Sequence, residues 1–524
     1  MMRKHSLRGT AVRDRLVPIV ALVLCLFAFF AFFSVVSPAY ILDWDDWGNI
    51  SLMRSGLPVW KIWNPTKVFP EVLMSSCGMA GGLLLNPFVN DYVESVKLVC
   101  AGTFSLFLTA YFSVFYLMLR KRFGAGRMVA VGWTAVFVFL HFVTFPLNGN
   151  RGIYLLYSPS VTTFFNYTIP NVCNAAYVML LIAGYGSVMH EKGRILAKGF
   201  MVFGAYLCVY SNLFSSVVLV AYVGACLVCD LVAWIRSASR PPLLSYVREH
   251  VLELVIVALW LASLVFEANG GRATSLAEGD VNMPFVSLVS HAGQMLVRRL
   301  IDTRRLIAIL ALVALVAWIV WMVRNRGESR RLTSELVRIA IAIALTAVYL
   351  VLLSARTVPS NTYRPDVIYG VLFFVFLGTA LSLGELVRRH PAVNACLPFA
   401  VFLLACAAPV TNRGFAPIYQ LDASPTTVKS IDHDVIGQVK EATERGDDVV
   451  RVRVPHVTND QNWPLRVTEE GEPTYVGVTL YRHGVIDKPI EVYFVEDAQK
   501  NAEFGVPEPT GEEPQKVAAV IVLP

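Results

Sequence analysis

Residues 16–47 read LVPIVALVLCLFAFFAFFSVVSPAYILDWDDW, an apolar run that ends in three aspartates set between two tryptophans. The run from Leu16 to about Pro38 is long enough to cross a bilayer, because about 20 apolar residues span the hydrocarbon core as a helix. It follows a basic segment and lacks a small-residue cleavage site, so we expect a retained first span with a cytoplasmic N-terminus. Asp43, Asp45 and Asp46 then lie just outside the membrane.

The rest of the chain continues this pattern. Of its 524 residues 56% are hydrophobic and only 16% are charged, and the mean hydropathy is +0.56. Ten further apolar runs lie at about 94–119, 127–147, 171–189, 197–211, 213–235, 249–267, 305–323, 337–354, 366–386 and 392–410. Basic residues gather in alternate connections, which accounts for the net charge of +7 without a nucleic-acid partner. The sequence predicts an all-α polytopic protein of the plasma membrane with about eleven transmembrane helices in residues 1–410, surrounded by lipid.

Residues 411–524 differ in composition from what precedes them. The long apolar runs stop, and short alternating stretches at 449–454, 475–481, 490–495 and 517–522 are typical of strands. Under the same charge pattern, the C-terminus lies on the side opposite the N-terminus. We therefore expect a small α+β or β-rich extracytoplasmic domain.

Two external segments carry helical periodicity. In loop 39–93, apolar residues recur at helical spacing from Trp47 to Leu57, which predicts an amphipathic interfacial helix beginning at Trp47. Prolines and the Gly78–Gly82 region predict irregular backbone beyond it. Residues 286–303 predict a second interfacial helix.

Polarity is unevenly distributed between spans and loops. The spans hold almost no ionisable residue near the bilayer centre, which weighs against an ion-coupled carrier. The external loops hold most of the unusual charges, among which Lys61 and Lys67 look like ordinary loop residues. No phosphate-binding loop, dinucleotide fingerprint or nucleophile elbow is present, so cytosolic nucleotide chemistry is not supported.

An acidic cluster directly after the first span, together with this span layout, resembles the GT-C superfamily of membrane glycosyltransferases. Asp45-Asp46 is similar to the paired acidic motif of that superfamily, with Asp43 as an extra or alternative member. The resemblance implies transfer of a sugar, with inversion, from a polyprenyl-phosphate donor to an extracytoplasmic glycan or lipid acceptor. At residue level it covers about 40–60 and, more loosely, 145–171 and 355–370.

The resemblance gives the aspartates a chemical role. An acceptor hydroxyl is a weak nucleophile, and a carboxylate that takes its proton contributes roughly 10²–10⁴-fold. We expect Asp45 to be this base, then Asp43, with Asp46 nearby. The three could also hold a divalent cation, Mg or Mn, although the chemistry does not require one. The alternative is that Asp46 caps the interfacial helix and the others are solvated charges.

Further residues are candidates for binding the donor and acceptor. Arg364, Arg356 and Arg151 could hold the departing phosphate, since guanidinium groups bind phosphate oxygens in pairs; the alternative is contact with lipid headgroups. Trp47, Asn166, Tyr167 and Asn171 could contact sugar rings and hydroxyls, and the alternative is an aromatic belt at the interface.

Two other functions fit the same layout. One is a flippase or transporter of lipid-linked sugars. The other is a glycan polymerase or ligase of the O-antigen type, which would depend more on the external arginines than on the aspartates. The sequence carries no signature of the sugar, the acceptor or the oligomeric state.

Overall fold

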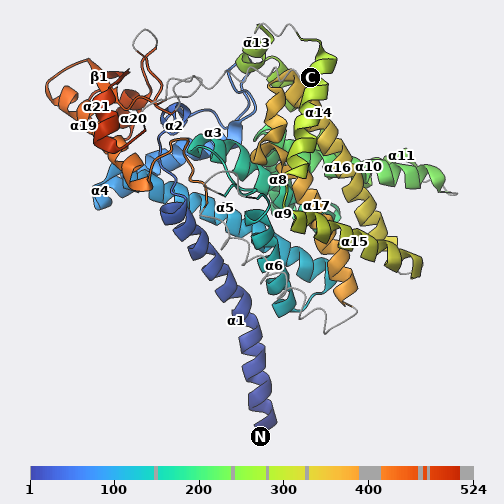
Figure 1. Cartoon of the computed structure of the whole chain (residues 1–524). Helices are drawn as coiled ribbons and strands as arrows, with labels where there is room; N and C mark the ends of the chain where they lie inside the picture. The colour runs from blue at the N-terminus through green and yellow to red at the C-terminus, as the bar shows by residue number, and fades with distance from the viewer. Residues whose placement is uncertain are drawn as a thin grey trace.

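The computed structural model describes residues 2–146, 152–237, 242–278, 283–324, 330–388, 415–457, 464–468 and 472–507. This part of the chain is mostly helical (Figure 1). Helix α1 (Met2–Ala31) continues into a π-helical turn, η1 (Phe32–Val36), and projects from the body with the N-terminus at its far end. Its exposed apolar residues are those expected of a helix that contacts lipid.

Ten of the eleven predicted spans coincide with described helices. After α1 these are α5 (Tyr92–Phe123), α6 (Arg127–Phe142), α8 (Ile169–Ile182), α9 (Ile195–Val209), α10 (Leu213–Arg236), α12 (Val251–Ala268), α15 (Arg305–Arg324), α16 (Arg330–Arg356) and α17 (Pro365–Arg388). The eleventh, at 392–410, lies outside the described residues. Eight helical segments in the described part are long and apolar enough to cross a membrane, namely seven of these ten and the segment Val68–Val89, whereas α6, α8 and α9 are shorter. The chain is a multi-pass helical membrane protein.

The predicted break between the fifth and sixth spans is confirmed. Helix α9 ends at Val209 and α10 begins at Leu213. Asn212 caps α10, because its side-chain oxygen accepts a hydrogen bond from the backbone N–H of Phe214 at 2.9 Å.

The prediction for loop 39–93 was wrong in two respects. The helix that was expected to begin at Trp47 is α2 (Trp44–Asn49), and it is only six residues long. Where irregular backbone was expected, α3 (Val68–Met79), η2 (Ala80–Leu85) and α4 (Asn86–Val89) form one apolar helical segment. Pro70 falls in the first turn of α3, where a proline removes no helical hydrogen bond.

The glycines of this segment allow close packing instead of breaking the helix. A Cβ atom on Gly78 would lie 2.2 Å from the carbonyl oxygen of Ile50, and one on Gly82 would lie 2.5 Å from Cβ of His483. Because glycine has no side chain, α3 and η2 can approach both α2 and the C-terminal segment closely at these two positions.

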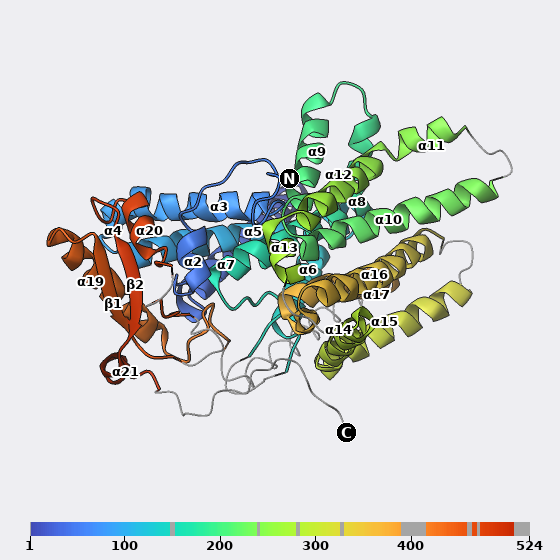
Figure 2. The same ribbon diagram turned by 90° about the horizontal axis from the view of Figure 1, so that it is seen from above.

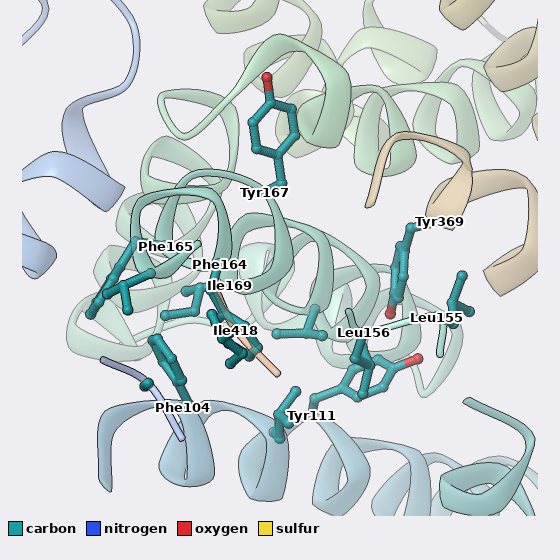
Figure 3. Packing of buried hydrophobic residues seen from close by; sticks show 14 of the residues in the cluster. Phe104, Tyr111, Leu155, Leu156, Phe164, Phe165, Tyr167, Ile169, Tyr369 and Ile418 are labelled. Carbon is teal, nitrogen blue, oxygen red and sulfur yellow. The ribbon is translucent and has the colours of Figure 1, made fainter. Parts of the chain in front are cut away.

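The packed interior is rich in aromatic residues, and Figure 3 shows part of it. The rings of Phe104, from α5, and Phe164, from η3 (Phe164–Thr168), stack with centroids 3.8 Å apart. In Figure 3 Phe164 and Phe165 lie on the side of Phe104, whereas Tyr167 points away from them. The π-helical turn η3 therefore directs Tyr167, which is also buried, away from Phe104 and Phe164.

The C-terminal segment contains a two-stranded sheet among helices. Its elements are α19 (Pro425–Glu444), β1 (Val449–Val454), α20 (Val476–Arg482), β2 (Glu491–Glu496) and α21 (Ala498–Phe504). The strands pair in parallel, with Val449 opposite Glu491. The predictions of strands at 449–454 and 490–495 are confirmed, and 517–522 lies outside the described residues.

The strand predicted at 475–481 is wrong, because this stretch is helix α20. Val476 and Leu480 are four residues apart, and both are buried. This spacing places them on one face of a helix, and it would also place them on one face of a strand. Alternation over so short a stretch does not distinguish the two structures.

The C-terminal segment packs on α2, α3 and the start of α5, as Figures 1 and 2 show. The hydroxyl of Thr479 donates to the carbonyl of Trp47 at 2.6 Å, and the hydroxyl of Tyr92 lies 2.7 Å from Nδ1 of His483. Lys429 pairs with Asp91 at 2.8 Å. These contacts hold the C-terminal segment beside the acidic stretch.

Candidate active site

Asp43 and Asp46 form a capping box at the start of α2. The Asp43 carboxylate accepts a hydrogen bond from the backbone N–H of Asp45 at 3.0 Å, and Asp46 accepts one from the N–H of Asp43 at 3.3 Å. Asp43, not Asp46 as considered above, therefore occupies the N-cap position. The second oxygen of Asp46 accepts from the N–H of Thr162 at 2.6 Å, in α7 (Val161–Thr163). The pair fastens α2 to α7.

Both carboxyl groups of this pair are buried. Burial and then repulsion by Asp46 raise the pKa of Asp43. Burial also raises the pKa of Asp46, while hydrogen bonds from Thr162 offset part of that rise. Both oxygens of Asp46 and one oxygen of Asp43 accept hydrogen bonds from backbone N–H groups, so these two aspartates have a structural task.

Asp45 differs from its two neighbours. Its side chain is exposed, and within the described residues it makes no hydrogen bond or ion pair. Dense protein around it raises the pKa of Asp45, while Lys67 and Arg272 lower it. A carboxylate with a raised pKa that is free to accept a proton is the arrangement a general base requires.

Lys67, at the start of α3, is near enough to this free carboxylate to lower its pKa. Only 8% of Lys67 is exposed, and among the described residues its ammonium group has no hydrogen bond or ion pair. Burial, and then repulsion by Arg272, lower the pKa of Lys67. Buried charges are ordinarily paired, so an unpaired buried ammonium indicates a site for an anion.

The loop that precedes Lys67 is fixed by its own polar contacts. Arg54 donates to Glu71 at 2.7 Å, and Thr66 donates to Glu267, near the end of α12, at 2.7 Å. The backbone N–H of Arg272, in α13 (Gly271–Glu278), donates to the carbonyl of Trp63 at 3.2 Å. The positions of Lys67 and Arg272 are thus set by contacts between distant parts of the chain.

Three of the residues predicted to bind substrate or phosphate meet at one place. Arg364 forms a two-pronged ion pair with Asp366, at 3.1 and 2.6 Å, and its guanidinium lies 4.7 Å from the centre of the Tyr167 ring. The side-chain amide of Asn171 donates to the backbone carbonyl of Asp366 at 2.6 Å. Asp366 had not been predicted; only its position two residues after Arg364 could have suggested it.

Tyr167 connects this group with Lys67. Burial raises the pKa of Tyr167. The positive charges of Arg364, Lys67 and Arg272 together lower this pKa by more than burial raises it, so the net shift is downward. Since Lys67 and Arg272 act on both Tyr167 and Asp45, one cationic cluster extends from the free carboxylate to Arg364. We call Lys67, Arg272 and Arg364 the cationic cluster.

The other predicted residues lie elsewhere. Arg356 is exposed and lies over the ring of Phe285, in α14 (Phe285–Ile301), at 4.7 Å, and Arg151 is outside the described residues. Trp47 is buried in the core, and the buried side-chain oxygen of Asn166 has no hydrogen bond. The substrate roles of these four residues stay predictions. The helix predicted at 286–303 is confirmed by α14.

Lys67 and Arg272 had not been predicted as functional residues. Neither belongs to a motif, and only their proximity in space to Asp45 makes them notable. A faint signal existed for Lys67, because it directly precedes the apolar stretch that forms α3.

The three aspartates were also considered as metal ligands. Asp43 and Asp46 direct oxygens at backbone N–H groups, and no three acidic, histidine or cysteine side chains in the described part of the chain gather as a metal site. A divalent cation at these aspartates stays a prediction, and the transfer of a sugar does not require one.

No protein-family model, curated protein or solved structure matches the chain.

Proposed function

We propose that this protein is a membrane glycosyltransferase that moves a sugar from a polyprenyl-phosphate donor to an extracytoplasmic glycan or lipid. The observation that supports it best is the free carboxylate of Asp45 beside the buried, unpaired Lys67. A transfer of this kind needs a base for the acceptor and positive charge for the departing phosphate, and the two lie together here.

The reaction would proceed in one inverting step. The acceptor hydroxyl gives its proton to Asp45 as its oxygen forms a bond with the anomeric carbon of the donor sugar. The bond between that carbon and the phosphate oxygen breaks, and its electron pair leaves with the phosphate. Lys67, Arg272 and Arg364 stabilise the negative charge that develops there.

The two neighbouring aspartates would act through position. The capping box fixes α2, and the bond from Thr162 to Asp46 fixes α2 against α7. Asp45 is therefore presented from a short, anchored helix, and the transfer step does not require a side chain on a mobile loop.

The test measures release of polyprenyl phosphate, which does not depend on knowing the acceptor. The full-length protein in membranes of the producing cells is given synthetic polyprenyl-phosphate mannose, glucose, galactose and arabinose in turn. We expect release with one donor, reduced at least about 100-fold in Asp45→Asn. Release that is equal in Asp45→Asn and in the unaltered protein, or absent with every donor, would contradict the proposal.

A matched control comes from the same helix. Asparagine caps helices about as well as aspartate, so Asp43→Asn should keep α2 intact and retain most of the release. Glu441→Gln, on an exposed position of α19, controls for loss of a carboxylate in general.

The alternative functions give different outcomes in this experiment. A flippase or transporter would release no polyprenyl phosphate and would tolerate Asp45→Asn in a sugar translocation assay. A polymerase or ligase would tolerate Asp45→Asn but fail in Arg364→Ala or Arg151→Ala.

A further inference from the structure

A pocket of about 810 Å³ opens between α2 and the C-terminal segment. Trp44 from α2 forms part of its wall, and the remaining lining residues come from the C-terminal segment between Asp448 and Glu491. Its volume falls within the roughly 300–1,000 Å³ that is usual for small-ligand sites. None of its lining residues takes part in the site described above.

The pocket has an aromatic wall. The rings of Trp44 and Tyr475 meet edge to face with centroids 6.2 Å apart, and the guanidinium of Arg466 lies 5.3 Å from the centre of the Trp44 ring. Tyr475 is 39% exposed, so part of its ring is available to a ligand. Aromatic faces carry negative charge density that attracts the C–H groups on the apolar face of a sugar ring.

The rim of the pocket is polar and mainly acidic. Of the three lining carboxylates, that of Asp448 is paired with Lys488 at 2.9 Å, which leaves those of Glu472 and Glu491 against the single guanidinium of Arg466. Ionised carboxylates accept hydrogen bonds from hydroxyl groups, and these bonds are short and strong. The same charges repel an anionic ligand, so the rim favours a neutral polyhydroxylated molecule over a uronic acid or a phosphate.

The position of the pocket relative to Asp45 is fixed. The Tyr475 ring packs against Gly48, where a Cβ atom would lie 2.8 Å from the ring. Arg482 donates to the carbonyl of Ser51 at 3.0 Å. Together with the bond from Thr479 to Trp47, these contacts clamp α20 to α2, and Trp44 directly precedes Asp45 in that helix.

From this arrangement we infer that the pocket binds a neutral oligosaccharide segment of the acceptor and holds it so that a hydroxyl beyond the pocket reaches Asp45. The inference rests on the proposed function, because it assigns the acceptor side of the same reaction. It makes the acceptor a glycan, not a simple lipid, and places its recognition in the C-terminal segment.

The binding test uses the purified full-length protein and saccharides of known structure. Intrinsic tryptophan fluorescence is titrated with mannotetraose, maltotetraose, cellotetraose and, as the anionic counterpart, tetragalacturonate. We expect at least one neutral tetrasaccharide to bind, with a Kd of the order of 1 mM, and tetragalacturonate not to bind. Tetralysine serves as a probe for a basic peptide.

Variants assign the binding to this pocket. Tyr475→Ala should weaken saccharide binding at least about tenfold, and Arg466→Ala, at an exposed position, should weaken it without disturbing the contact with Gly48. Tyr475→Phe keeps the ring and should bind within about threefold of the unaltered protein. Tyr481→Ala removes an exposed tyrosine of α20 that lies outside the pocket, and this variant should bind normally.

The outcomes separate this inference from the proposed function. Binding of no neutral tetrasaccharide, binding unchanged in both Tyr475→Ala and Arg466→Ala, or binding of tetralysine alone would overturn the inference, even if polyprenyl phosphate is still released. Saccharide binding in a protein that releases no polyprenyl phosphate from any donor would instead overturn the proposed function. With both correct, Tyr475→Ala retains slow donor hydrolysis by water but loses acceleration by the bound saccharide.

Discussion

Charged side chains gather near both ends of the α10–α16 helix pair, but near one end two of them, Asp45 and Lys67, are left unpaired in the part of the chain that the structure describes. Where α10 ends and α16 begins, Arg338 lies 2.6 Å from Asp230 and 3.7 Å from Glu335. Glu335 also accepts from the hydroxyl of Tyr222 at 2.5 Å and lies 3.8 Å from Arg122. Each of these four charged side chains has a partner of opposite sign.

Near the other end Arg364 is paired with Asp366, but two charges are left over. Asp45 and Lys67 make no hydrogen bond or ion pair within the described residues, although Lys67 is almost completely buried. Paired groups stabilise the fold, whereas unpaired ones keep their charge available for a ligand. The comparison teaches that pairing, not the number of charges, distinguishes a structural cluster from a candidate site.

Among the substitutions that test this comparison, Lys67→Met is expected to have the largest effect on polyprenyl phosphate release. Loss of the ammonium removes stabilisation of the departing phosphate, and we expect polyprenyl phosphate release to fall by roughly 10²-fold. Because a buried unpaired charge is removed, the thermal unfolding temperature should not fall. A large loss of unfolding temperature with little loss of release would show that Lys67 is structural.

The pH dependence of polyprenyl phosphate release should show the ionisation of both Asp45 and Lys67. Asp45 acts as a base only when ionised, and its pKa is raised, so release should decline as the pH falls through a value above the ordinary aspartate range. The pKa of Lys67 is lowered, so release should decline as the pH rises through a value below the ordinary lysine range. Lys67→Arg should remove the alkaline decline, since guanidinium stays charged. An alkaline limb that is unchanged in Lys67→Arg would exclude Lys67 as its source.

Arg338→Met tests the paired end. It leaves the nearly buried Glu335 without its closest cation, and we expect a loss of about 1–3 kcal/mol in the free energy of unfolding. Release per folded molecule should be unchanged. Calorimetry in detergent measures the free energy of unfolding, and the release assay measures activity per folded molecule. If Arg338→Met lost release without losing stability, the paired charges would not be purely structural.

The smallest effect is expected where α19 docks on α5. The pKa of Asp91 is lowered to about 2: burial raises it, but Lys429, the backbone N–H of Glu94 and His433 lower it more. The stabilisation is therefore present above the unfolded pKa of about 4 and is lost as pH falls toward 2. These side chains are partly exposed, so Asp91→Asn should cost at most about 0.5 kcal/mol, seen as faster amide exchange in α19. Unchanged exchange would show that apolar contacts alone hold α19.

Much of the fold could be predicted from the sequence. Long apolar runs and capping residues are local properties, and the helices fell where those runs lie. The segment Val68–Val89 was missed because its glycines and Pro70 were interpreted as breaks, whereas close packing against Ile50 and His483 makes those glycines useful inside a helix. That packing joins distant parts of the chain.

The candidate site could be predicted only in part. The acidic stretch and the candidates Tyr167, Asn171 and Arg364 could be named from the sequence, but only the structure shows that these three meet at one place. Which aspartate is free depends on backbone N–H groups that bind the other two. The burial of Lys67 depends on how its loop folds onto α12, and no local pattern records that.

The most direct test of the account is a cryo-EM structure of the full-length protein with a short-chain polyprenyl phosphate bound. We predict that the phosphate oxygens lie within about 2.7–3.2 Å of Lys67 Nζ and of at least one guanidinium of Arg272 or Arg364, with Asp45 facing them across the space for one sugar. A phosphate bound elsewhere, with Lys67 still unpaired, would contradict the assignment of this cluster as the donor site.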